Sequence, residues 1–249
     1  YTNLASAIAT AANGDTIYAA GHTFITTYET VWTNKSLTIR GGYEGTGTPG
    51  NQDPTLWPTV IRQPSGFASY VRLVQLKTVT NAIIEDITFQ GGRLNQASGA
   101  CLYLNGGSNI TLRGIKIQNG YGYSGNGGTI YGAGIYANTT KKLIISSSVI
   151  QSNTYYINAA NVRGAGIYLG NVADCTISNT IIRANGITPA GWLGPIAGGV
   201  CIEGGNVYMR DCVILGNYTT GNGGTTLGAG FYSSSGNHII KNCLIVLNS

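Results

Sequence analysis

Charged residues are scarce in this chain. Only 9% of its 249 residues are Asp, Glu, Lys or Arg, and the formal net charge is +5. The basic residues are scattered singly, apart from Lys141 and Lys142, whereas a nucleic-acid-binding surface requires them to cluster. We therefore predict no nucleic-acid partner. Few charges with 38 Gly and many Asn, Ser and Thr are unlike most cytosolic enzymes and favour an extracellular or cell-surface protein.

Long apolar runs and metal-binding motifs are missing as well. No apolar run reaches the ~18 residues of a membrane-spanning helix, so we predict no membrane span in this chain. The two His residues, His22 and His238, are far apart in the sequence, and no CxxC pair occurs, so we predict no metal site and no cofactor. The five Cys residues are an odd number and do not form a disulfide framework.

What the chain does contain is a repeat. Successive copies open 33, 32, 33 and 31 residues apart, at Gly99, Gly132, Gly164, Ala197 and Gly228. They close at Gly120, Asn153, Asn185, Asn217 and Asn248. Self-similarity at a fixed period is typical of proteins built by stacking one structural unit on the next. The closing Asn residues would lie above one another, and we predict that their side-chain amides bond from copy to copy as a ladder.

Within each copy the apolar positions follow a period of two, as in a strand with one buried face. Alignment on the closing residue gives one inward column of Ile84, Leu112, Ile145, Ile177, Met209 and Ile240. The pattern predicts three short strands wound into a triangular coil. Cys101 and Cys201 are predicted to point outward, and Cys175 into the core. Cys212 and Cys243 share a column on adjacent coils, and whether they are bonded stays open.

This pattern resembles the right-handed parallel β-helix, the pectate-lyase-like superfold. The GAGIY…N repeat is most similar to those of polymorphic outer-membrane proteins and related bacterial surface adhesins, although an aliphatic residue stands where that family has Phe. The resemblance covers residues 82–249 and implies an all-β, single-stranded solenoid. Its implication for function is broad, because lyases, hydrolases, adhesins and phage tailspikes share the superfold.

We expect one domain, 1–249. Residues 1–20 are predicted to hold an N-terminal capping helix, at about 2–12, and the first strand; 21–81 to form early coils with a long loop at 44–59; and 82–249 to form regular coils of about 32 residues. The chain begins with Tyr1 rather than Met and ends at a closing corner, so we expect its last coil to be covered by further coils or by another subunit stacked end to end.

Candidate ligand-binding residues are aromatic. One outward column is predicted to form a partly exposed tyrosine ladder, and insertions at one corner (121–131, 154–163, 186–196 and 218–227) are predicted to form a ridge, the kind of face that commonly binds ligands. Flat aromatic rings could stack on sugar rings, but solvated turns with incidental aromatics would look the same. The candidates are Tyr103, Tyr136, Tyr168, Tyr232, Tyr121, Tyr123, Tyr155, Tyr156 and Trp192.

Catalytic residues are not predicted. Glycoside hydrolysis requires two carboxylates facing one bond, and no two acids in the aligned coils share an outward column on adjacent coils. Glu85 and Asp86 are neighbours, but successive strand residues face opposite ways unless Asp86 lies at a corner. The outward column with Arg113, Arg210 and Lys241 fits solubilising charge.

These observations predict a non-enzymatic, extracellular β-solenoid: a surface adhesin or passenger, or a subunit of a filament. Its partners would be surface glycans or further copies of itself. The alternative is a carbohydrate-active enzyme, such as a polysaccharide lyase or glycoside hydrolase, or a carbohydrate-binding module that uses the outward tyrosine face. Convergence of two carboxylates, or of Lys or Arg with a carboxylate, in a groove would favour the enzyme.

Overall fold

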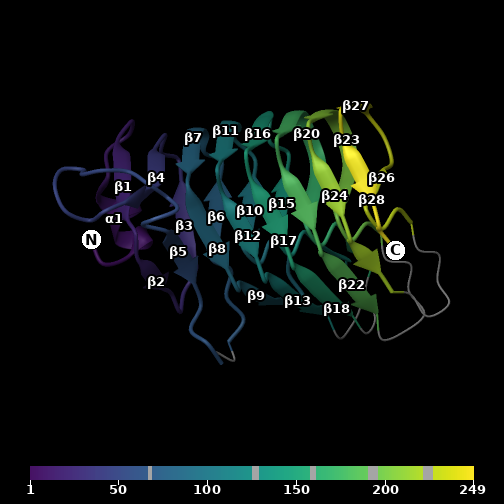
Figure 1. Cartoon of the computed structure of the whole chain (residues 1–249), viewed down its shortest axis with the longest axis horizontal. Helices are drawn as coiled ribbons and strands as arrows, with labels where there is room; N and C mark the ends of the chain where they lie inside the picture. The colour runs from purple at the N-terminus through teal and green to yellow at the C-terminus, as the bar shows by residue number, and fades with distance from the viewer. Residues whose placement is uncertain (67–68, 125–128, 158–160, 190–195, 221–226) are drawn as a thin grey trace.

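The computed structural model describes residues 1–66, 69–124, 129–157, 161–189, 196–220 and 227–249. In it the chain forms an elongated solenoid of stacked coils, with the two termini at opposite ends (Figure 1). Every strand pairing within the described residues is parallel, apart from one isolated bridge between Tyr43 and Gln52. The prediction of a parallel β-solenoid is therefore confirmed.

Four sheets line the solenoid in the part of the chain that the structure describes. The largest has 13 strands: β1 (Thr16–Ala20), β3 (Thr30–Thr33), β4 (Thr38–Tyr43), β6 (Val74–Lys77), β7 (Thr80–Glu85), β10 (Leu102–Asn105), β11 (Ser108–Arg113), β15 (Ile135–Asn138), β16 (Lys142–Ser146), β20 (Ile167–Ser178), β23 (Val200–Arg210), β26 (Phe231–Ser233) and β27 (Asn237–Lys241). The second has eight: β2 (Thr23–Ile25), β5 (Thr59–Arg62), β8 (Ile87–Gln90), β12 (Lys116–Gln118), β17 (Val149–Gln151), β21 (Ile181–Arg183), β24 (Val213–Leu215) and β28 (Leu244–Val246).

The other two sheets lie beyond the closing corner of each coil. One has five strands: β9 (Arg93–Asn95), β13 (Tyr121–Ser124), β18 (Thr154–Ile157), β22 (Gly186–Pro189) and β25 (Tyr218–Thr219). The other pairs β14 (Thr129–Tyr131) with β19 (Asn161–Arg163). The predicted three strands per coil were therefore too few, because the supposed insertions begin with strands that pair from coil to coil. Their Tyr, Thr and Ile residues favour extended backbone, and the sequence alternates there as in a strand.

A short helix, α1 (Leu4–Thr10), precedes the first coil, within the predicted range. Asn3 caps its N-terminus, since the Asn3 side-chain oxygen accepts a hydrogen bond of 2.8 Å from the Ser6 amide. At the other end the Lys35 ammonium donates to the carbonyls of Ile8, Ala9 and Ala11, each at 2.8 Å. No helix in the described part of the chain is long and apolar enough to cross a membrane.

The predicted inward column forms the core. Leu112, Ile145, Ile177 and Met209 are in register on successive coils, and each is 0% exposed. Ile240 continues the register but is 41% exposed, because β27 is paired on one side only. The covering of this last coil by another subunit or by further coils stays a prediction.

The predicted asparagine ladder is confirmed. The side-chain amide of Asn153 donates to the side-chain oxygen of Asn185 at 2.9 Å, Asn185 donates to Asn217 at 2.9 Å, and Asn217 donates to Asn248 at 3.0 Å. Each of the first three amides also bonds a buried backbone carbonyl. The ladder ties four coils together at the corner that leads into the five-stranded sheet.

Each ladder Asn packs against a glycine of its own coil. A Cβ atom added to Gly166 would lie 2.9 Å from the Asn185 side-chain nitrogen, and Gly134, Gly199 and Gly230 stand in the same relation to their Asn residues. In the coil that closes at Gly120, the small and the large residue of this pair are exchanged. Gly120 stands where the other coils have Asn, and Cys101 stands where they have Gly. The Cys101 sulfur lies 3.0 Å from where a Gly120 Cβ would be. The prediction that Cys101 points outward was therefore wrong: its thiol is fully buried and fills the space of the missing Asn amide.

Gly166→Ala is expected to destabilise the protein by roughly 1–3 kcal/mol, because the new methyl group overpacks the corner. The backbone angle at Gly166 is compatible with alanine, so the clash is the cause. Cys101→Ala, which shortens a side chain at the equivalent position, is the matched control and should cost less. Urea unfolding of both variants measures the difference. If both variants lose the same free energy of unfolding, the account in which Cys101 and Gly120 exchange the small and the large position is wrong.

Candidate functional site

The outward tyrosine column is a stack of rings, as predicted. The rings of Tyr103 and Tyr136 have centroids 4.7 Å apart with 16° between their planes, and those of Tyr136 and Tyr168 are 5.5 Å apart with 8° between planes. Cys201 and Tyr232 occupy the next two coils in the same register.

This column is less accessible than the sequence predicted. The ring of Tyr131, from β14, lies 4.2 Å from that of Tyr168, which is only 6% exposed. Cys201 lies in the outward column, as predicted, but it is fully buried in a cluster with Tyr168 and Ala197, and the Arg72 guanidinium covers Tyr103 at 4.4 Å. Burial raises the pKa of Tyr136, and that of Tyr168 further. Tyr168 also donates a hydrogen bond of 2.7 Å to Glu203, so its role here is structural.

Tyr155 was also predicted to lie on the surface, and this prediction is wrong because the side chain is buried. It is 1% exposed and donates a hydrogen bond of 2.8 Å to the Tyr131 carbonyl. Alternation along β18 points Tyr155 inward, between Thr154 and Tyr156. Gly122, its partner in register on β13, leaves room for the ring, since a Cβ there would lie 1.8 Å from it. Trp192, the remaining candidate, lies outside the described residues.

The accessible aromatic surface is on the five-stranded sheet. Tyr123 and Tyr156 are in register on β13 and β18, and their rings stack with centroids 6.1 Å apart and planes 10° apart. Tyr156 is 41% exposed, and Tyr121 and Tyr123 are partly exposed. We call Tyr70, Tyr121, Tyr123 and Tyr156 the tyrosine patch.

Tyr70, Tyr123 and Tyr156 are near enough to Tyr121 to influence its pKa. Burial raises the pKa of Tyr121, the Arg93 guanidinium opposes this shift, and Tyr70, Tyr123 and Tyr156 add to it. Arg93 stands over the Tyr121 ring at 5.3 Å. Tyr70 is 45% exposed and was not among the predicted residues. It lies in a connection before the regular repeat, where no column could align it with the others.

The patch offers aromatic stacking on strands that carry no carboxylate. The strands of the five-stranded sheet read RLN, YGYS, TYYI, GITP and YT, so Arg93 is their only charged residue. Exposed rings held on rigid strands can contact the flat, apolar faces of a ligand, and the tyrosine hydroxyls can bond its polar edge.

Carboxylates and arginines do meet elsewhere on the solenoid. Glu85 is 4% exposed, and its two oxygens bond Arg40 at 2.7 Å and Arg113 at 2.5 Å, in register across three coils. Asp86 lies at a corner with a φ of 55°, as the sequence allowed. Burial raises the pKa of Asp86, with Glu85 as the second cause, and its side chain accepts a bond of 3.2 Å from Gln52.

Glu85 and Glu203 are committed to ion pairs. Both oxygens of Glu85 are held by arginine, and Glu203 bonds Arg163 through one oxygen and Tyr168 through the other. Arg72 and Glu29 form a further pair at 2.7 Å. Arg113, from the outward cation column, thus serves an ion pair, and Arg210 bonds Asp211 at 2.8 Å. Within the described ranges no three His, Cys, Asp or Glu residues are grouped as a metal site would require.

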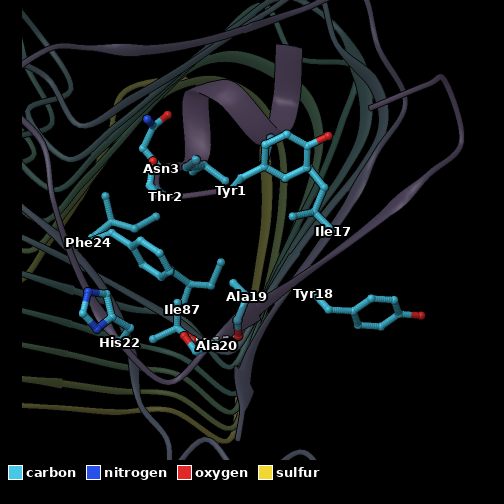
Figure 2. Close-up of a pocket in the computed structure, with 14 residues that line it drawn as sticks. Tyr1, Thr2, Asn3, Ile17, Tyr18, Ala19, Ala20, His22, Phe24 and Ile87 are labelled. Carbon is cyan, nitrogen blue, oxygen red and sulfur yellow. Dashed lines mark hydrogen bonds between the residues drawn. The ribbon is translucent and has the colours of Figure 1, made fainter. Parts of the chain in front are cut away.

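An apolar cavity of about 390 Å³ lies at the N-terminal end, beside α1 (Figure 2). Figure 2 shows Phe24, Ile87 and Ile17 around it, with Tyr1 above and His22 at its edge. Ala19 and Ala20 are also among its lining residues. Its lining residues include no Asp, Glu, Lys or Arg, and none of the predicted ligand-binding residues lines it.

Comparison with known proteins identifies the fold. Residues 71–249 match a family model described as a right handed beta helix region. No curated protein and no solved structure matches the chain. The narrower likeness to bacterial surface adhesins stays a prediction.

Proposed function

The chain belongs to the right-handed β-helix family, and from that premise we propose that it is an extracellular β-helix that binds glycans through its tyrosine patch without cleaving them. The family includes pectate lyases and surface proteins, so the fold alone is compatible with catalysis and with binding. The observation that carries the proposal is the exposed, stacked pair of Tyr123 and Tyr156 on a rigid sheet.

Rigid placement of the rings supports binding. Side chains on paired strands lose little further freedom when a ligand docks, so less of the contact energy is spent on ordering them. The rings of Tyr123 and Tyr156 lie in register on adjacent coils, so one elongated ligand along the solenoid axis could contact both. Arg93 and Asn95, on the neighbouring strand β9, supply hydrogen-bond donors at one end of this row.

The distribution of acids supports binding rather than cleavage. Hydrolysis of a glycosidic bond requires two carboxylates at the scissile bond, and lyase chemistry requires a base. The strands beneath the patch carry no carboxylate, and the oxygens of the buried Glu85 and the partly exposed Glu203 are bonded to arginine or tyrosine. A catalytic role for Glu85 or Glu203 would require these ion pairs to open.

Replacing Tyr123 and Tyr156 together by Ser is expected to lower the affinity for a bound polysaccharide roughly 5- to 100-fold, because each of the two aromatic contacts contributes roughly 0.5–1.5 kcal/mol. Immobilised plant, algal and bacterial polysaccharides are the probes, and retention of wild type and variant is compared by affinity electrophoresis.

The control is Tyr28→Ser, which removes an equally exposed tyrosine (48%) outside the patch. It should bind as tightly as the wild type. Thermal unfolding of all three proteins shows whether any loss of binding comes from unfolding. The proposal fails if the wild type binds none of the polysaccharides, or if the double variant and the control bind alike.

A further inference from the structure

Cys212 and Cys243 occupy one position on adjacent coils. Each directly precedes a strand of the eight-stranded sheet. The register of β24 with β28 pairs Val213 with Leu244, so the two cysteines lie one above the other. The two thiols adopt the same orientation: Cys212 donates to the Arg210 carbonyl at 3.2 Å and Cys243 to the Lys241 carbonyl at 3.3 Å. The Cys243 thiol is also close enough to contribute to the raised pKa of Cys212.

This arrangement is close to that of a disulfide. Paired strands lie about 4.8 Å apart, within the ~4.4–6.8 Å between Cα atoms that a disulfide requires. The Cβ atoms of two parallel side chains must approach by about one ångström to reach the usual ~3.8 Å. The outer coil can make this movement, because β28 pairs only with β24 and Leu244 is 53% exposed.

The other cysteines have no such neighbour. Cys175 is in register with Leu143 and Val207, and Cys201 with Tyr168 and Tyr232. Cys101 lies in the corner beside Gly120. All five are free thiols in this structure. Adjacent placement of two cysteines is thus confined to the last two coils, where the solenoid is least covered.

We propose that Cys212 and Cys243 form a reversible disulfide that fastens the last coil to the one beneath it. The oxidant is a small-molecule or protein disulfide. The Cys243 thiolate, which is partly exposed, attacks one sulfur of that disulfide, forms a mixed disulfide and releases one thiol. The Cys212 thiolate then attacks the Cys243 sulfur, so the second thiol leaves. Two protein thiols are oxidised and one external disulfide is reduced to two thiols.

The order of the two steps follows from burial. Cys212 is 1% exposed, and burial raises its pKa to about 11, so it does not meet an external disulfide first. It acts when the mixed disulfide at Cys243 is already in contact with it. Closing the bond constrains the intervening loop in the unfolded chain, and it should raise the Tm by roughly 5–10 °C.

The test is to incubate the full chain with glutathione disulfide and to measure its intact mass. The expected wild-type product has lost two hydrogens, carries no glutathione, and yields a peptide that joins Cys212 to Cys243. Cys212→Ser should keep one glutathione on Cys243, and Cys243→Ser should leave Cys212 unmodified. Cys175→Ser is the matched control and should still form the disulfide.

Two results would overturn the proposal. Wild-type protein that retains glutathione on Cys243 would show that Cys212 cannot reach it, and wild-type protein with all thiols unchanged would show that Cys243 does not react. Because the decisive measurement is made on the wild type, it does not depend on whether the variants fold.

Discussion

Ile177→Asp is expected to prevent folding. Ile177 is 0% exposed and packs in register between Ile145 and Met209, so the new carboxylate would be buried between two coils without a partner. A substitution of this kind costs at least about 5 kcal/mol, which is comparable to the whole stability of many domains. Circular dichroism of the purified variant should show little strand signal, or the protein should fail to accumulate in soluble form.

Thr176→Asp is the matched control. It places the same charge one residue earlier, where the strand faces outward and the side chain is partly exposed. This variant should fold and lose about 1 kcal/mol or less. If Ile177→Asp melts within a few degrees of Thr176→Asp, the assignment of Ile177 to the core is wrong.

Asn185→Asp is expected to break the asparagine ladder in a pH-dependent way. The Asn185 side-chain nitrogen donates to the Ile150 carbonyl at 3.0 Å and to the Asn217 side-chain oxygen at 2.9 Å. An ionised Asp carboxylate has the same shape as the Asn amide, but it has no N–H to donate to the Ile150 carbonyl and the Asn217 side-chain oxygen. The loss should be several kcal/mol at neutral pH, because buried polar groups are left unpaired beside a buried charge.

Acid should restore part of this stability. Burial among oxygens would raise the pKa of the new carboxyl above its unfolded value of about 3.9, so protonation favours the folded state. The free energy of unfolding, relative to wild type, is then highest below pH ~3.9 and falls as the pH rises towards the folded pKa. Urea unfolding of both proteins across this range measures the effect. A difference that does not change with pH would mean that the carboxyl is solvated rather than within the ladder.

The repeat made the core and the ladder predictable. A period near 32 residues aligns each coil with the next, so the burial of Leu112, Ile145 and Met209 and the bonding of the closing Asn residues follow from columns of like residues. The capping helix was predictable from local signals, because Asn3 precedes a short apolar pattern. The core column and the ladder repeat from coil to coil, and the helix depends on its own local sequence.

Predictions failed where neighbouring side chains decide exposure. Tyr155 is buried because Gly122, one coil away, leaves space for its ring. Cys101 faces the core because Gly120 leaves space at a corner where the other coils have Asn. Tyr168 is covered by Tyr131, which belongs to a strand that the three-strand interpretation placed in a loop. Alternation along a strand gives a side chain's direction, but it does not show what lies above it.

Binding without cleavage is the central claim for this β-helix, and one measurement addresses both halves of it. A polysaccharide retained by the wild type is incubated with the protein at high concentration, and its chain-length distribution is followed by size-exclusion chromatography with light scattering. We predict that the protein co-elutes with the polysaccharide and that the chain length stays constant, whereas Tyr123→Ser/Tyr156→Ser elutes alone. Shortening of the polysaccharide by the wild type would contradict the claim and identify an enzyme.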